Sequence, residues 1–149
     1  MAEARSGIAA PAGPPAMTLQ LAVEDLDTTE AFYAGILGMP VERALTWVGA
    51  PEHLVMNLDG FRVIFVDESE LVDAHPFFLE RLESFPKGIG MTLHLEVSGI
   101  GEIYQAILEE DLEVLYPLER KPYGTLELWC FDPDGYLVVM EERIKAGER

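Results

Sequence analysis

Hydrophobic and polar residues alternate along several short segments of this chain, which is the pattern of half-buried β-strands. In the first of these segments Leu19, Leu21 and Val23 share one face, and the polar residues at 18 and 20 lie on the other. Behind it, Asp27 and Glu30 have the spacing of a capping pair at the start of a helix. The pattern therefore predicts a strand followed by a helix.

The same order of elements occurs twice along the chain. Three pairs of segments are similar at offsets of 74, 71 and 75 residues: 18–23 with 92–97, 32–37 with 103–108, and 59–64 with 134–139. Two copies of a module of about 50 residues indicate a duplicated supersecondary unit rather than a long solenoid. Each copy is expected to contain one strand, one helix and three further strands.

These elements predict an α+β fold in which two tandem βαβββ modules form cupped mixed sheets around a cleft. After the first strand and helix, the first module is expected to have strands at 41–46, 53–58 and 61–67. The second is expected to have a strand at 91–97, a helix at 101–110 and strands at 113–118, 126–131 and 136–142. A helix is also expected at 76–85, with an apolar face formed by Phe77, Phe78, Leu82 and Phe85. The predicted divisions are a flexible N-terminal tail (1–16), the first module (17–67), a helical connector (68–89), the second module (90–142) and a C-terminal tail (143–149).

The composition adds a strong acidic excess to this picture. The 27 acidic and 10 basic residues leave a net charge of −17, and residues 90–142 alone hold twelve acids against two bases. Nucleic acids and anionic membranes need a basic surface, so neither is an expected partner. The acidity is explained by a solvated surface or, alternatively, by attraction of a cationic ligand.

The cysteine content and the N-terminus predict the cellular setting. Cys130 is the single cysteine, so an internal disulfide cannot form, and it is expected to be a buried apolar residue. Residues 1–16 lack the basic start and apolar core of a secretory signal, and no stretch approaches ~18 consecutive apolar residues. We therefore expect a soluble cytoplasmic protein.

Two groups of residues carry a resemblance to a known family. They are Val23-Glu24-Asp25-Leu26-Asp27 with Phe32-Tyr33 and Leu37-Gly38, and Lys121-Pro122-Tyr123-Gly124 with Phe131-Asp132-Pro133-Asp134-Gly135-Tyr136. In these motifs the chain resembles the vicinal oxygen chelate superfamily, which includes glyoxalase I, extradiol dioxygenases and bleomycin-resistance binding proteins. The resemblance covers nearly everything from Met17 to Glu142 and implies the same paired βαβββ fold.

The resemblance also implies a divalent metal held by the first and last strands of each module. The corresponding positions here are Thr18, Ile64, Thr92 and Val139, none of which is a usual metal ligand. The expected protein therefore lacks the usual metal and resembles the metal-free bleomycin-resistance-type binders.

An alternative metal site arises two residues further along each strand. This shift keeps the same face of the strand and gives Gln20, Val66, His94 and Glu141. A divalent metal at Gln20, His94 and Glu141 would suit a lyase, isomerase or dioxygenase of the superfamily. The other reading is a pocket that binds a ligand by hydrogen bonds, with His94 as a polar wall residue.

The favoured prediction is a small-molecule binder with no cofactor, of the kind that confers antibiotic resistance. Aromatic rings would hold a cationic or aromatic molecule in the cleft, and polar side chains would orient it. The predicted ligand-binding residues are Gln20, Trp47, His94, Glu96, Tyr123, Trp129 and Glu141. Tyr123 matches the aromatic residue that lies beside a Pro-x-Gly motif in the ligand groove of related drug-binding proteins. A homodimer is implied by the resemblance alone.

Overall fold

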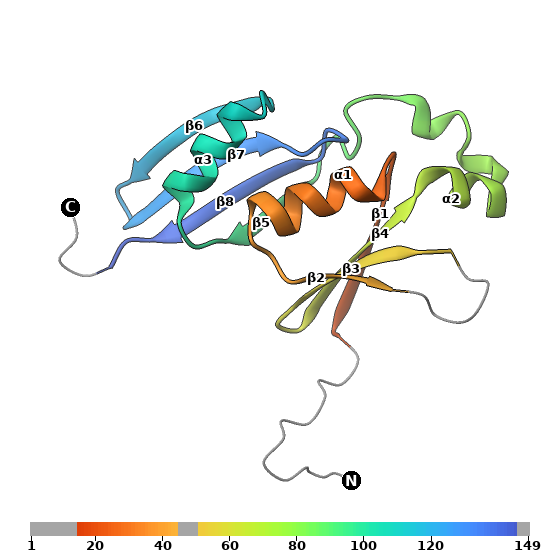
Figure 1. Cartoon of the computed structure of the whole chain (residues 1–149), viewed down its shortest axis with the longest axis horizontal. Coiled ribbons are helices and arrows are strands. Elements are labelled where there is room, and N and C mark those ends of the chain that lie inside the picture. Colours follow the sequence, from red (N-terminus) through yellow and green to blue (C-terminus); the bar gives the residue numbers. More distant parts are fainter. Residues whose placement is uncertain (1–14, 45–50, 146–149) are drawn as a thin grey trace, which may run out of the picture.

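The computed structural model describes residues 15–44 and 51–145 of the 149-residue chain. Two four-stranded mixed sheets lie next to one another, with helices packed against them (Figure 1). The strand order is β1-β4-β3-β2 in the first sheet, sheet A, and β5-β8-β7-β6 in the second, sheet B. In each sheet the first strand of the module runs parallel to the last, and the other neighbours are antiparallel. The predicted α+β fold of tandem βαβββ modules is confirmed.

The first module follows the expected order of elements. It comprises β1 (Met17–Val23), helix α1 (Leu26–Glu30) continued by the π-helical turn η1 (Ala31–Ile36), β2 (Val41–Ala44), β3 (His53–Leu58) and β4 (Phe61–Asp67). The β2 strand was expected to reach residue 46, and the last two of those positions lie outside the described residues. The Asp-Gly turn between β3 and β4 is a hairpin, as predicted.

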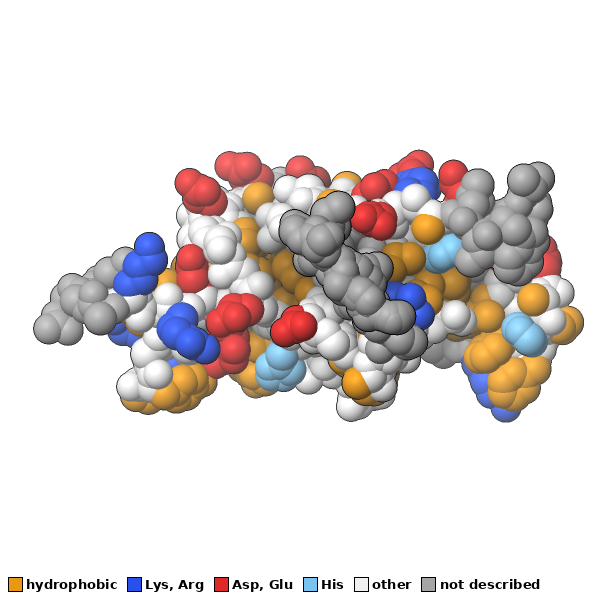
Figure 2. Space-filling model, turned by 90° about the horizontal axis from the view of Figure 1, so that it is seen from below, with side chains coloured by type: hydrophobic (Ala, Val, Ile, Leu, Met, Phe, Trp, Pro, Cys, Tyr) orange, Lys and Arg blue, Asp and Glu red, His pale blue; other side chains and the backbone are white. Residues whose placement is uncertain are grey.

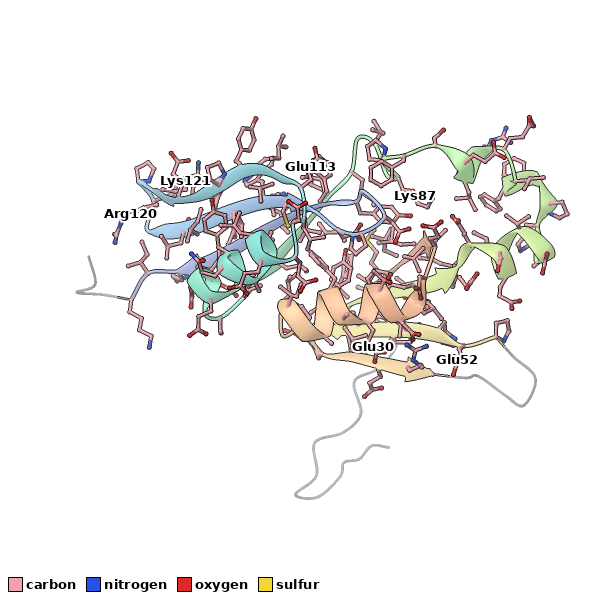
Figure 3. All side chains as sticks on the ribbon, turned by 45° about the horizontal axis from the view of Figure 1, so that its top comes forward. Glu30, Glu52, Lys87, Glu113, Arg120 and Lys121 are labelled. Atoms are coloured by element: carbon pink, nitrogen blue, oxygen red, sulfur yellow. The ribbon has the colours of Figure 1, made fainter. Side chains whose placement is uncertain are left out.

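The predicted capping pair of α1 was wrong. Asp25 is the last extended residue, at φ −146° and ψ 114°, and its side chain accepts a hydrogen bond from the backbone N–H of Asp27 at 3.0 Å. Asp27 and Glu30 instead pair with Arg43 of β2, each at 2.7 Å. Glu52, which lies near Glu30 in Figure 3, approaches the same guanidinium at 3.4 Å. These ion pairs fasten α1 to the edge of sheet A.

The connector folds differently from the expected helix at 76–85. Its regular helix is α2 (Glu68–Ala74), followed by the short 3-10 turns η2 (Pro76–Phe78) and η3 (Arg81–Glu83). The helix begins early because the Asp67 side chain accepts a hydrogen bond from the backbone N–H of Ser69 at 2.8 Å. It ends before Pro76, which has no N–H to continue it. The Phe77 and Phe85 side chains, expected on an apolar face, are exposed.

The second module repeats the first with small shifts in its boundaries. It comprises β5 (Thr92–Glu96), α3 (Ile100–Glu109), β6 (Val114–Lys121), β7 (Thr125–Phe131) and β8 (Leu137–Arg143). Helix α3 begins after Gly99, which has no side chain to cap it. The carboxylate of Glu142 on β8 replaces the cap and accepts hydrogen bonds from the backbone N–H groups of Gly99 (3.0 Å) and Ile100 (2.9 Å). No helix in the two described ranges is long and apolar enough to cross a membrane.

Buried polar contacts join the two modules. The Tyr33 hydroxyl of the first module donates a hydrogen bond to Asp132 at 2.6 Å, and the backbone N–H of Glu24 donates to Asp134 at 2.8 Å. Both aspartates belong to the turn between β7 and β8, and both are buried. The hydrophobic core lies between the helices and one face of each sheet, which leaves the other face of each sheet open. The largest fully buried core side chains include Phe32, Phe65, Leu54, Met56, Ile107, Leu128 and Met140.

Candidate functional site

The open face of sheet B carries two rows of side chains that cross all four strands. Leu93, Leu128 and Met140 point into the core, so the residues next to them on each strand point outward. The register of the strands aligns these outward residues across the sheet. We call the first row the aromatic row (His94, Val139, Trp129 and Tyr116) and the second the carboxylate row (Glu96, Glu141, Glu127 and Glu119).

The aromatic row provides a hydrophobic surface. Tyr116 and Trp129 pack edge to face, with ring centroids 5.2 Å apart and an interplanar angle of 77°. Val139, the neighbour of Trp129 on β8, is fully buried, whereas the Tyr116 side chain is exposed. The ring surface that this row leaves accessible is therefore that of Tyr116 and of the half-buried Trp129.

The carboxylate row places like charges directly opposite one another. Its three neighbouring pairs are Glu96 with Glu141, Glu141 with Glu127, and Glu127 with Glu119. Such pairs destabilise a sheet. Basic residues reduce this repulsion at the two ends of the row. Lys121 contacts Glu119 at 2.8 Å, and the exposed Arg143 lies 3.7 Å from Glu96. Figure 2 shows acidic, basic and histidine side chains close together over the left half of the molecule, which carries sheet B.

Glu127 is the buried member of this row, with a side chain only 7% exposed. Its Oε2 accepts a hydrogen bond from the Tyr123 hydroxyl at 2.5 Å, and its Oε1 accepts one from the indole Nε1 of Trp129 at 3.3 Å. The hydrogen bond from Tyr123 is the main cause that lowers the pKa of Glu127; the hydrogen bond from Trp129 and the charge of Lys121 also lower it, and burial opposes them. The same hydrogen bond raises the pKa of the Tyr123 hydroxyl. Glu127 is therefore an ionised carboxylate at neutral pH, held between two aromatic side chains.

A groove of about 530 Å³ lies on the open face of sheet A. Its volume falls within the range of small-molecule pockets. Ile64 and Val66 of β4 form an apolar floor, Leu71 of α2 forms a wall, and the lining also includes Gln20 and His53. All of its lining residues come from the first module, the connector and the two residues before β3. The groove is thus separate from the two rows of sheet B.

The predicted ligand-binding residues divide between these two faces. Gln20 lies in the groove of sheet A, whose lining includes neither His94 nor Glu141. Those on the open face of sheet B are His94, Glu96, Trp129 and Glu141, with Tyr123 in the turn between β6 and β7. Trp47 lies outside the described residues. The binding role of each of these residues stays a prediction.

Sequence reasoning missed Glu127 and Tyr116. Alternation along 127–129 gave the signal for Glu127, because residues two apart on a strand share a face and Trp129 was already a candidate. The corresponding signal for Tyr116 was weaker, because β6 has irregular register with β7 on both sides of this residue. Its contact with Trp129 follows from the strand pairing, which the sequence does not reveal.

The usual metal positions of the fold do not fit a divalent ion. Thr18 and Thr92 are exposed hydroxyl residues, Ile64 lies on the groove floor, and Val139 is buried in the aromatic row. Ile and Val have no donor atoms, so these four side chains cannot form the ligand set that such a metal requires. In the described part of the chain, no group of three or more His, Cys, Asp or Glu side chains is arranged to hold a metal. The displaced site remains a prediction.

The paired βαβββ modules, each with an open mixed sheet, define the class of protein to which this fold belongs. A sequence model of the Glyoxalase/Bleomycin resistance protein/Dioxygenase superfamily matches residues 16–140. The chain therefore belongs to that superfamily. No curated protein matches it at a significant level.

Solved structures agree with this fold at low sequence identity. A glyoxalase/bleomycin resistance protein/dioxygenase family enzyme from Burkholderia phytofirmans PsJN is 12% identical with a TM-score of 0.62, and the match covers 88% of this chain and 100% of the other. A glyoxalase-related enzyme from Fulvimarina pelagi is 18% identical with a TM-score of 0.58, covering 89% and 94%. TioX from Micromonospora sp. ML1 is 16% identical with a TM-score of 0.56, covering 89% and 100%. At these identities the likeness shows the fold alone.

Proposed function

We propose that this protein binds a small planar cation against the two rows of sheet B, without the superfamily's usual metal. The observation that carries the proposal is the alignment of an aromatic row with a carboxylate row on one open face. Ring faces attract cations as well as flat apolar molecules, and neighbouring carboxylates add the charge. Binding of this kind would suit a drug-binding protein of the antibiotic-resistance type.

The charges of the described residues favour a cation over an anion. The carboxylate row holds four acids, and Lys121 and Arg143 are the basic residues paired with its outer members. Lys121 lies toward the outer end of sheet B (Figure 3). The central carboxylates, Glu127 and Glu141, are thus in place to interact with a positive ligand above the sheet.

The proposal includes a homodimer. A flat molecule on the open face of sheet B would be covered from one side by its own chain, and the groove around Gln20 faces out from sheet A. We propose that the groove of one subunit covers the rows of its partner, which would enclose the ligand. Sedimentation at equilibrium would return the mass of a dimer, and a monomer at micromolar concentration would contradict this part of the proposal.

The proposal also includes a cytoplasmic location. The free, buried thiol of Cys130 is compatible with the reducing conditions of the cytoplasm.

The binding proposal is tested with two probes of similar size and opposite charge. N-methylquinolinium is a planar monocation, and 2-naphthalenesulfonate is a planar monoanion. We expect tryptophan fluorescence to be quenched by the cation and not by the anion. In equilibrium dialysis, which needs no tryptophan, Trp129→Phe should weaken cation binding by about ten-fold. Phe77→Leu, an exposed aromatic residue on the connector, is the control and should bind as the wild type does. Equal binding of both probes, or of neither, would refute the proposal.

The second candidate is a metal-dependent lyase, isomerase or dioxygenase. One observation favours it: His94 and Glu141 lie on the neighbouring strands β5 and β8 and point to the same open face. A metal bound there would need Gln20 or another donor to complete the set. Metal analysis of protein purified without chelators tests this candidate. Stoichiometric metal that is lost in His94→Ala would replace the binding proposal by the enzymatic one.

A further inference from the structure

The carboxylate of Glu127 differs from the rest of its row because it is both buried and engaged by two aromatic side chains. We propose that Glu127 is a positioning residue: it holds Tyr123 and Trp129 as a fixed wall and makes that wall prefer cationic rings to neutral ones. The inference rests on the proposed function for its ligand, but the positioning role can be measured without any ligand.

The positioning role of Glu127 is supported by the geometry around it. Tyr123 lies in the turn between β6 and β7, and 66% of its surface is exposed. Its hydroxyl is fixed by Glu127 at 2.5 Å, and the Trp129 ring is fixed through its indole nitrogen at 3.3 Å. A single carboxylate thus links an exposed ring on a turn to a ring on the sheet. Both bonds end on a charged acceptor, the stronger kind of hydrogen bond.

The preference for cationic rings is supported by the charge of Glu127. Glu127 is surrounded by donors that are neutral, because the phenol and the indole each donate a proton without bringing a positive charge. Lys121, the nearby base, contacts Glu119 at 2.8 Å. The ionised form of Glu127 is favoured by its hydrogen bonds, and its burial reduces screening by water. A cationic ring stacked on this wall would meet a fixed negative charge that a neutral ring cannot use.

The two halves are separated by two substitutions at one position. In Glu127→Gln the charge is lost, yet the amide oxygen can accept from Trp129 and the amide nitrogen can donate to the Tyr123 hydroxyl. In Glu127→Met the charge and both hydrogen bonds are lost. Glu141→Gln is the matched control, because it removes one charge from the neighbouring position of the same row. The parent protein for these tests is the Trp47→Phe variant, and every further variant also carries this substitution. Trp129 is then the single tryptophan.

The positioning role is tested without ligand. We expect the indole N–H resonance of Trp129 to shift and broaden in Glu127→Met, and its fluorescence to become at least about two-fold more accessible to acrylamide. Glu127→Gln and Glu141→Gln should keep a single sharp indole resonance. Circular dichroism and urea unfolding establish that each variant is folded. If folded Glu127→Met retains the resonance and quenching of the parent protein, Glu127 is not a positioning residue.

The selectivity is tested with N-methylquinolinium and its neutral analogue quinoline at pH 7.5. We expect the parent protein to bind the cation at least about ten-fold more tightly, and Glu127→Gln to lose most of that ratio. Glu127→Met should weaken both probes, and Glu141→Gln should lower the ratio only about two-fold because Glu141 is more exposed. Equal effects of the Gln substitutions at 127 and 141 would assign the selectivity to the whole row and overturn this half. Binding of neither probe by the parent protein would overturn the proposed function and the selectivity, while the indole resonance would still decide the positioning role.

Discussion

Asp132 gives the sharpest prediction on stability, because a carboxylate that joins the two modules is only 3% exposed. Its Oδ1 accepts hydrogen bonds from the backbone N–H groups of Asp134 (2.9 Å) and Tyr136 (3.0 Å), and its Oδ2 accepts one from the Tyr33 hydroxyl (2.6 Å). Burial outweighs these three bonds, which lower the pKa, and the charge of Asp134 adds to burial. The pKa of Asp132 is thereby raised from 3.8 to about 6.

The raised pKa determines whether the free energy of unfolding rises or falls with pH. The folded state keeps the Asp132 proton to a higher pH than the unfolded state does, so this group makes the free energy of unfolding fall as the pH rises from about 4 to 6. A shift of about two pH units at ~1.4 kcal/mol per unit amounts to about 3 kcal/mol in all. About half of this, between about 1 and 2 kcal/mol, falls between pH 5 and 8, a range that lies above the sequence pI of about 4.3.

Asp132→Asn removes the titration and keeps the shape of the side chain. The amide oxygen can accept from both backbone N–H groups, and the amide nitrogen can donate to the Tyr33 oxygen. Urea unfolding at several pH values between 5 and 8 should therefore show the free energy of unfolding of the variant gaining between about 1 and 2 kcal/mol relative to the wild type as the pH rises. Other carboxylates titrate alike in both proteins and largely cancel in the difference.

Tyr33→Phe provides the opposite perturbation. It removes the hydrogen bond that lowers the pKa of Asp132, so it should steepen the fall of stability with pH. A difference between Asp132→Asn and wild type that is constant from pH 5 to 8, or that declines, would refute the assignment of a raised pKa to this buried carboxylate.

Three further predictions concern local structure. Gly135→Ala should cost more than about 2 kcal/mol, because a Cβ would lie 2.5 Å from the Cβ of Pro86 at a φ of +91°; Gly124→Ala, at φ +90° with open space around it, should cost only about 1 kcal/mol, and equal losses in urea unfolding would contradict the contact. Glu142→Gln should lower the free energy of unfolding at pH 7 by about 1 kcal/mol through its cap on α3, whereas an unchanged midpoint would show that the cap is dispensable. Burial raises the pKa of the Cys130 thiol to about 12, so Ellman's reagent should react with it only after unfolding, and rapid labelling of the native protein would count against burial.

The modules could be predicted from the sequence because their signals are local. Alternation with period two identifies a strand within a few residues, and an Asp-Gly turn identifies the hairpin that ends the first module. The repeat at an offset near 74 residues then predicted that both modules have the same fold. The same reasoning predicted the helix of the connector at the wrong position. Its aromatic residues suggested an apolar helix face, but the local cap at Asp67 and the lack of an N–H at Pro76 decided where the helix formed.

The candidate site could be predicted only in part, because its geometry depends on which strands are neighbours. Alternation assigns each of Glu96, Glu127 and Glu141 to a face of its own strand, whereas a register shift between Tyr116 and Glu119 breaks the alternation on β6. Their alignment into one row needs the pairing of β5 with β8, of β8 with β7 and of β7 with β6, and the last pairing has irregular register. The hydrogen bond from Tyr123 to Glu127 similarly depends on how the β6–β7 turn folds back over the sheet.

The carboxylate row is also where the sequence works against the stability of its own sheet. Three like-charged pairs stand directly opposite one another, although Thr or Lys at alternate positions would favour the same strand pairing. Other charges in the described chain support the fold, as in the ion pairs of Arg43. Local choices that disagree with the fold are expected at functional sites, where binding offsets their cost. On the function proposed above, a cation above Glu127 and Glu141 would relieve the repulsion that the sheet tolerates in the free protein, so the pairs that weaken the sheet would strengthen cation binding.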